Sequence, residues 1–171
     1  MRLLSFSKSS AHSWGLLRDD GIVDLGGECA DLQGFIAAGC PGLDHLAQRP
    51  ADHDLSDVTL EPVIPNPSKI IMAALNYFED GDDKDKAPDY PVLFLRLPAS
   101  QIGHGAPLVC PRSSQKLDFE GELAVIIGHG GRHIATEDAL DHVFGYSIYN
   151  DGSVRDWQRH SHQFTPGKNF V

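Results

Sequence analysis

The stretch that decides the fold reads Leu117-Asp118-Phe119-Glu120-Gly121-Glu122-Leu123-Ala124-Val125-Ile126-Ile127. Its odd positions are apolar or glycine, whereas its even positions begin with Asp118, Glu120 and Glu122. Because side chains alternate along a strand, the pattern predicts one strand over 117–127 with an apolar face. Glu120 and Glu122 then project from the same face, roughly 6.5–7 Å apart along the chain.

Two interpretations of this acidic face stay open. Alternation alone is typical of the solvated face of a half-exposed strand. However, the even positions continue as Ala124 and Ile126, so we expect the strand to enter the interior and place the two glutamates near a buried rim. Unpaired carboxylates there carry a desolvation cost that a cation removes. An all-oxygen set of ligands favours Mg²⁺, Mn²⁺ or Ca²⁺ over zinc.

A second polar cluster follows a predicted strand over 146–149. It reads Tyr149-Asn150-Asp151-Gly152-Ser153-Val154-Arg155-Asp156-Trp157-Gln158-Arg159. It brings acceptors, a guanidinium and an amide into one short segment. Since Asn, Asp, Gly and Ser are also ordinary turn residues, a capped loop and a functional site are both compatible with it.

The rest of the chain has more strand patterns than helix patterns. Strands are predicted at 3–6, 14–18, 22–25, 69–75 and 92–95, and helices at 31–38 and 137–143, the second capped by Thr136. Residues 48–67 are rich in Asp and Pro and are interpreted as a linker. The predicted fold class is therefore α+β and predominantly β, with a small β-rich N-terminal subdomain.

Composition limits the classes of partner. The 171 residues carry a formal net charge of -10, with 41% apolar and 22% charged residues. This acidity argues against nucleic-acid and anionic-membrane partners, which need clustered Lys and Arg. The start lacks the apolar stretch of a secretory signal, and no run reaches the length of a membrane span. The cysteines have no C-x-x-C spacing, so we expect a cytoplasmic protein without a disulfide framework.

Taken together, the order of motifs from about residue 66 onward resembles the fumarylacetoacetate hydrolase family. The resembling segments are Lys69-Ile70-Ile71 to Asn76-Tyr77, Tyr90 to Leu95, Leu117 to Leu123, Gly145-Tyr146 to Asn150-Asp151, Arg155-Asp156-Trp157-Gln158 and Gly167-Lys168-Asn169-Phe170. The resemblance implies the β-roll of that family over 66–171, preceded by a subdomain and linker over 1–65.

The resemblance also implies roles for particular residues. Glu120, Glu122 and Asp151 match the family's ligands to a divalent metal, usually Mg²⁺ or Mn²⁺. Arg155 and Gln158 match residues near the substrate, and Lys168, in the G-K-x-F segment, matches a catalytic and substrate-binding lysine. The implied activity is that of a hydrolase or lyase acting on a 2-oxo or 1,3-dicarbonyl acid. Such enzymes cleave C–C bonds, decarboxylate, hydrate or isomerise through a metal-stabilised enolate. A homodimer is also expected.

The chain departs from the family pattern after Asn76-Tyr77. Family hydrolases carry a His and a Glu there that activate water, and ungapped spacing places Asp80 and Asp83 at those positions. Asp80 could act as a base only with a pKa raised toward neutrality; otherwise the acidic run is a solvated loop. His104, His160 and His162 are the alternative proton-transfer groups, although a lone loop His is more often a surface residue.

Family members also continue beyond the G-K-x-F segment, whereas this chain stops at Val171. We therefore expect an incomplete sheet with an open edge, to be covered by another chain or by further sequence. Because of this early end and the replaced His and Glu, two alternatives to an enzyme stay open. One is a non-catalytic relic that binds a metal or a 2-oxo acid, and the other is a structural subunit without metal.

Overall fold

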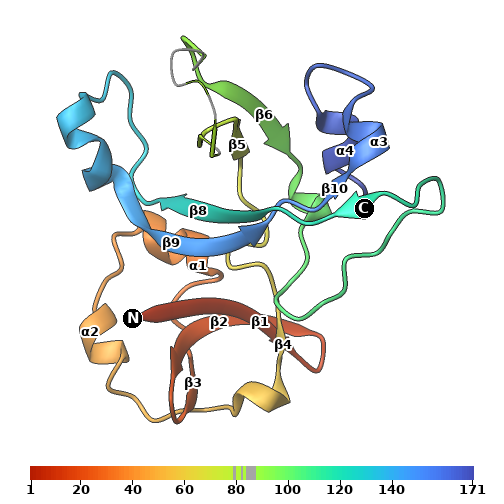
Figure 1. Cartoon of the computed structure of the whole chain (residues 1–171). Helices are drawn as coiled ribbons and strands as arrows, with labels where there is room; N and C mark the ends of the chain where they lie inside the picture. The colour runs from red at the N-terminus through yellow and green to blue at the C-terminus, as the bar shows by residue number, and fades with distance from the viewer. Residues whose placement is uncertain (79, 82, 84–87) are drawn as a thin grey trace. The chain divides into compact units, whose positions relative to one another are not determined.

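In the computed structural model, the described residues are 1–78, 80, 81, 83 and 88–171. Strands predominate, which confirms the predicted α+β, mostly β fold class (Figure 1). The chain divides into two compact units, each described by itself below. The first consists of Met1–Pro65, Ile102–Pro107 and Gly121–Asn150, and the second of Asn66–Gln101, Leu108–Glu120 and Asp151–Val171. The predicted subdivision into 1–65 and 66–171 stays a prediction.

The first unit begins with a four-stranded antiparallel sheet in the order β3-β2-β1-β4. Its strands are β1 (Arg2–Lys8), β2 (Ala11–Arg18), β3 (Gly21–Asp24) and β4 (Thr59–Leu60). Gly21, the first residue of β3, has a φ of 130° that favours glycine. The predicted linker over 48–67 is wrong at β4, because Phe6 and Ser7 of β1 pair with residues 59–60.

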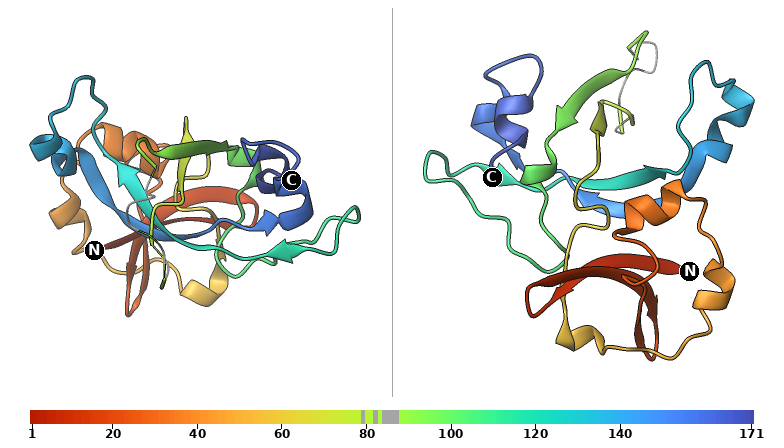
Figure 2. Two further views of the ribbon diagram at one scale, coloured as in Figure 1. Left: turned by 45° about the horizontal axis from the view of Figure 1, so that its top comes forward. Right: turned by 180° about the vertical axis from the view of Figure 1, so that it is seen from behind.

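Helix α1 (Leu32–Ala37) supplies much of the core of this unit. The Asp31 side chain caps it by accepting a hydrogen bond from Gly34 N at 2.7 Å, as expected for an N-cap aspartate. Figure 2 shows α1 beside the sheet. The buried core comprises Trp14, Leu16, Val23, Leu25, Leu32, Phe35, Ile36 and Leu46. The short α2 (Leu43–Leu46) and η1 (Leu55–Asp57) complete this part of the chain.

Asp24, at the end of β3, makes stability depend on pH. Burial by itself raises the pKa of Asp24, but hydrogen bonds from Ser13 Oγ (2.5 Å), Gly26 N (2.9 Å) and His53 outweigh it and lower the pKa. Since the unfolded pKa is about 3.9, this stabilisation is present above about pH 4 and lost as the pH falls through the folded pKa. We expect Asp24→Asn to show a smaller acid loss of stability in urea denaturation from pH 6 downward. Equal losses would contradict this assignment.

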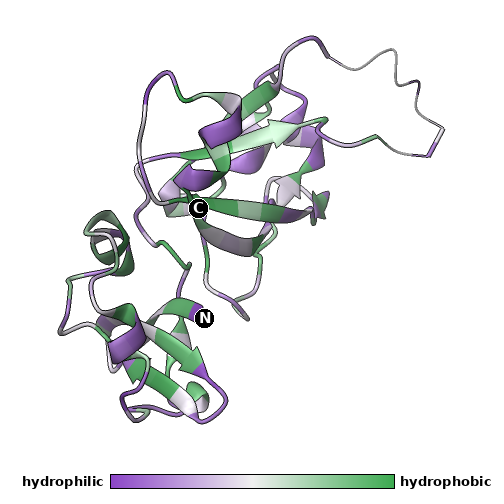
Figure 3. Ribbon diagram, turned by 90° about the vertical axis from the view of Figure 1, so that its left-hand side faces the viewer, coloured by the Kyte–Doolittle hydropathy of each residue, from purple (hydrophilic) through white to green (hydrophobic). Residues whose placement is uncertain are grey.

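The strands β8 (Gly121–Ile127) and β9 (Val143–Asn150) form an antiparallel pair that also belongs to the first unit. The prediction that the even positions enter the interior is correct, because Ala124 is half-buried and Ile126 packs against the core. The odd, apolar positions are instead exposed, Leu123 to 62%. Figure 3 colours the ribbon by hydropathy, with hydrophobic residues in green.

The helix predicted over 137–143 is wrong in type and in cap. Residues Thr136–His142 form the 3₁₀ helix η4, Ala135 stands at its N-cap, and no side chain caps it. Gly145 lies inside β9. The strand β9 therefore begins directly after η4, at Val143, and takes over the positions expected for the end of the helix.

The single strand predicted over 117–127 is also wrong, because it is two strands. β7 (Leu117–Asp118) pairs with β10 (Ser153–Val154), whereas β8 pairs with β9. Phe119 and Glu120 lie in the interval where the chain changes its pairing partner. Alternation of the sequence continues through this interval, so periodicity alone does not reveal the break.

The second unit contains the pair β5 (Ile70–Ala74) and β6 (Val92–Arg96). It also contains η3 (Pro98–Ser100), β7, β10 and the short helices α3 (Arg155–Gln158) and α4 (Thr165–Lys168). The strand predicted over 69–75 corresponds to β5, and Ile71 is 56% exposed on one face of the pair. The other face carries the buried Phe94. Within the described residues, no helix has the length and apolarity needed to cross a membrane.

Candidate metal centre

Three carboxylates predicted as metal ligands meet where strands end. β9 ends at Asn150, and the next residue, Asp151, donates its backbone N–H to Glu120 O at 2.8 Å. Glu120 lies between β7 and β8, and Glu122 is the second residue of β8. One oxygen from each of Glu120, Glu122 and Asp151 lies within 4.8 Å of the other two.

The donor set fits a hard divalent cation. All three side chains offer carboxylate oxygens, the ligands that Mg²⁺, Mn²⁺ and Ca²⁺ prefer. Two oxygens on opposite sides of one ion are separated by about 4.8 Å when the metal–oxygen distance is roughly 2.4 Å. The spread of the three oxygens is therefore within the reach of a single ion. Glu120, Glu122 and Asp151 are the residues that would hold it.

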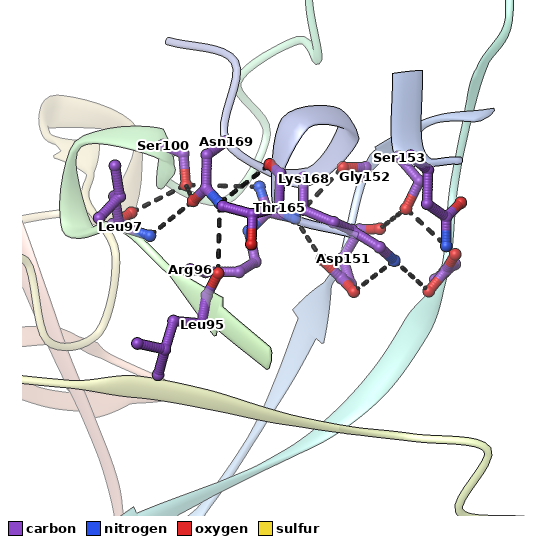
Figure 4. Close-up of polar contacts among 12 residues, drawn as sticks. Leu95, Arg96, Leu97, Ser100, Asp151, Gly152, Ser153, Thr165, Lys168 and Asn169 are labelled. Carbon is purple, nitrogen blue, oxygen red and sulfur yellow. Dashed lines mark hydrogen bonds and ion pairs between the residues drawn. The ribbon is translucent and has the colours of Figure 1, made fainter. Parts of the chain in front are cut away.

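Lys168, at the end of α4, reaches the same carboxylates. Its Nζ lies 2.7 Å from Asp151 Oδ2 and 2.8 Å from Glu120 Oε2 (Figure 4). The next residue, Asn169, fastens this segment: its Oδ1 accepts from Leu97 N at 2.6 Å, and its Nδ2 donates to Leu95 O at 3.2 Å. Lys168, predicted as a catalytic and substrate-binding residue, thus lies beside two of the predicted metal ligands. The hydrogen bonds of Asn169 hold this segment of the chain to the residues on either side of Arg96.

The sequence did not reveal Arg96, a buried cation at the end of β6. Arg96 Nη1 donates to the second oxygen of Asp151 and to Gly152 O, and Nη2 reaches Ser100 Oγ at 3.4 Å (Figure 4). Buried arginines are rare unless they are paired. The signal that could have found Arg96 is its charge within the apolar strand pattern Val92-Leu93-Phe94-Leu95-Arg96.

Arg155, at the start of α3, contacts Glu120 of the triad and the neighbouring, exposed Asp118. It pairs with Asp118 at 2.9 Å through Nη2, and its Nη1 contacts both Glu120 Oε1 and Gln158 Oε1, the latter at 3.1 Å. Ser153 Oγ donates to Glu120 Oε1 at 3.0 Å as well. The predicted substrate-binding residues Arg155 and Gln158 therefore contact each other directly, beside one of the predicted metal ligands.

These cations keep Glu120 ionised. Burial by itself raises the pKa of Glu120, but the hydrogen bonds and positive charges of Lys168 and Arg155 outweigh it and lower the pKa below the usual value. Burial has the opposite effect on a base and lowers the pKa of Arg155. The hydrogen bonds of Arg155 to Asp118 and Glu120 outweigh burial and raise its pKa above the usual value. Glu120 is thus held in the charged form that a metal ligand requires.

The other predicted groups lie elsewhere. Asp80 and Asp83 are exposed after β5, and His104 is exposed in the first unit. In the second unit, His160 and His162 line a shallow cavity of about 240 Å³, and the His160 ring packs 4.9 Å from the ring of Trp157. The structure records no contact of these three histidines with the carboxylate cluster among the described residues. Catalytic roles for all five residues stay predictions.

The fold and the site together define a β-rich protein with a candidate divalent-metal centre built from carboxylates. The chain belongs to the fumarylacetoacetate hydrolase family, because the family described as fumarylacetoacetate (FAA) hydrolase C-terminal matches residues 69–171. This confirms the resemblance inferred from the motifs.

Individual relatives agree with this assignment. The chain is 42% identical over 140 residues to oxaloacetate tautomerase YisK of Bacillus subtilis, covering 75% of this chain and 46% of that protein. It is 36% identical over 186 residues to mitochondrial oxaloacetate tautomerase fahd2 of Xenopus laevis, covering 99% and 58%.

A solved structure is also similar. Maleylpyruvate hydrolase from Sphingobium sp. SYK-6, in complex with manganese(II) ion and pyruvate, matches with a TM-score of 0.77 and 27% identity. That match covers 98% of this chain and 63% of the other. The chain therefore spans about half to three fifths of the length of the proteins that it matches.

Proposed function

We propose that this chain carries the metal centre of an enzyme that acts on a 2-oxo acid with the help of Mg²⁺ or Mn²⁺. The observation that carries the proposal is the single cluster in which Glu120, Glu122 and Asp151 adjoin Lys168 and Arg155. An acidic triad suits the cation, and the two basic side chains suit an anionic substrate. The manganese and pyruvate in the similar maleylpyruvate hydrolase structure support both parts of this proposal.

The residues of this chain have separable tasks in the proposed reaction. When bound, the metal would act as a Lewis acid toward the carbonyl oxygen of the 2-oxo acid. Lys168 Nζ carries a positive charge in a nearly dry environment, where it stabilises negative charge developing on a substrate oxygen. Arg155 can pair with a substrate carboxylate through its guanidinium, and Gln158 orients that guanidinium by accepting from Nη1.

Within this class we propose isomerisation, namely keto–enol tautomerisation of a 2-oxo dicarboxylic acid such as oxaloacetate. Hydrolysis needs a group that activates water, and Asp80 and Asp83 stand where the family hydrolases carry that pair. Tautomerisation needs no water as a reactant, because a proton leaves carbon 3 and a proton is added to the oxygen on carbon 2, or the reverse. Two relatives named as oxaloacetate tautomerases support this choice.

The test is the rate at which enol oxaloacetate converts to the keto form, followed by the ultraviolet absorbance of the enol. With Mn²⁺ present, we expect the parent chain to accelerate the conversion over buffer plus Mn²⁺, and Glu122→Ala to lose about 100-fold of that rate. Acylpyruvate hydrolysis is measured in parallel and should be slower. Acylpyruvate hydrolysis faster than tautomerisation would reverse the choice of reaction.

A non-catalytic binder of metal or 2-oxo acid is the second candidate function. The observation that favours it is the replacement of the water-activating pair by Asp80 and Asp83, which lie exposed. The same assays separate the candidates: retained Mn²⁺ without turnover of oxaloacetate or acylpyruvates would establish the binder. The cytoplasmic location and the homodimer stay predictions.

A further inference from the structure

The basic side chains of the site occupy the carboxylate oxygens that a metal would use. Lys168 Nζ contacts one oxygen of Asp151 and one of Glu120, at 2.7 and 2.8 Å (Figure 4). The remaining oxygen of Asp151 accepts from Arg96, and the remaining oxygen of Glu120 accepts from Arg155. Each of the four oxygens therefore already has a cationic donor.

Lys168 is the cation that both carboxylates share, and it is almost completely buried. Its exposed fraction is 2%, and that of Asp151 is 1%. A buried ammonium is stable only when it is paired, and here both of its partners are predicted metal ligands. Lys168 thus neutralises part of the negative charge that would otherwise attract a divalent ion.

The backbone of Lys168 has little freedom to withdraw from the carboxylates. A Cβ added at the preceding residue, Gly167, would lie 2.3 Å from Gln158 N, so the backbones of α4 and α3 are in direct contact. Asn169 holds the other side of Lys168 to the end of β6 through Leu95 and Leu97. Any adjustment to an entering metal is therefore left to the flexible side chain, whose Nζ lies 5.1 Å from the ring centre of Phe94.

We propose that Lys168 is a built-in competitor of the metal: its ammonium holds Glu120 and Asp151 together without metal and is displaced from at least one of them when the metal binds. An ammonium and a divalent ion that share two carboxylates in a buried site repel each other strongly. The affinity for the metal is therefore lower than the three carboxylates alone would give. This inference rests on the proposed function, because it concerns the same metal centre.

The test compares Mn²⁺ affinity by isothermal titration calorimetry in the parent and in three Lys168 variants. Lys168→Met and Lys168→Gln remove the charge and should bind Mn²⁺ about tenfold or more tightly than the parent. Lys168→Arg keeps the charge and should show no gain. Lys116→Met removes an exposed lysine of the same unit and should change the affinity by less than twofold.

A second measurement does not depend on binding calorimetry. The rise in melting temperature caused by Mn²⁺ should be larger in Lys168→Met and Lys168→Gln than in the parent. The reason is that the metal-free variants have lost their internal cation, whereas the loaded variants have the metal in its place. If either neutral variant is too unstable without metal for calorimetry, folding induced by Mn²⁺ is followed instead, and the affinity is corrected for the fraction of chain that is folded without metal.

The outcomes separate this inference from the proposed function. If the parent binds Mn²⁺ and both neutral variants bind it equally well or more weakly, competition by Lys168 is overturned while the metal centre stands. If neither the parent nor any variant binds Mn²⁺, both the metal centre and the competition are overturned. Tighter binding by the neutral variants, with no gain in Lys168→Arg, supports the inference.

Discussion

Asp151→Ala is expected to lose about 3–5 kcal/mol of unfolding free energy in the metal-free chain, because it removes the carboxylate that two buried cations share. Asp151 is 1% exposed, and its two oxygens accept from Lys168 and Arg96, which are themselves buried. Removing one member of such a pair leaves a charge in a medium that solvates it poorly. Urea denaturation in the presence of a chelator measures this loss.

Two comparison variants make the prediction specific to burial. Asp118→Ala removes an aspartate that pairs with Arg155 at 2.9 Å but is largely exposed, and it should cost much less stability than Asp151→Ala. The double change Asp151→Leu with Lys168→Met should be less destabilising than Asp151→Ala, because one of the two buried cations disappears together with the carboxylate. A cost for Asp151→Ala as small as that for Asp118→Ala would refute the buried ion-pair account.

The second large effect concerns Glu122→Ala, which should weaken Mn²⁺ binding by about 100-fold, or about 2.7 kcal/mol. Glu122 is half-buried at the start of β8 and supplies one of the three oxygens of the metal centre. With two carboxylates left, the ion loses both a ligand and a negative charge. Metal content after dialysis against a low concentration of Mn²⁺ measures the effect.

The control for this variant is Glu137→Ala, which removes an exposed glutamate from η4 in the same unit. It should retain the metal content of the parent protein. We expect Glu122→Ala to change the stability of the metal-free chain far less than Asp151→Ala, since Glu122 is not fully buried. Equal metal content in the parent and in Glu122→Ala would remove Glu122 from the set of ligands.

Local sequence was enough to predict most elements of the N-terminal sheet and the helix after it. Apolar runs predicted β1, β2 and β3, and the helix predicted over 31–38 contains α1. Such features depend on neighbouring residues and on capping hydrogen bonds, which the sequence displays directly. The family resemblance then gave the carboxylate triad and Lys168, which the structure brings together.

The failures have a common physical cause, namely pairing with residues distant in the sequence. The pattern over 117–127 alternates without interruption, yet the chain exchanges one strand partner for another at Phe119 and Glu120. Residues 59–60 look like linker but complete a sheet edge beside β1. Strand pairing is decided by what lies alongside, so a local pattern cannot specify it.

The sequence by itself predicted the mostly β class, and its resemblance to a family supplied the carboxylates of the candidate metal centre, because both depend on residue types and their order along the chain. Only the tertiary structure showed that Arg96, 55 positions before Asp151, forms a buried ion pair with that carboxylate. Only the tertiary structure showed that Lys168 already contacts two of the predicted ligands. Burial makes such contacts strong, since each charge must find its partner inside the protein. Burial and long-range contact arise only when the chain folds.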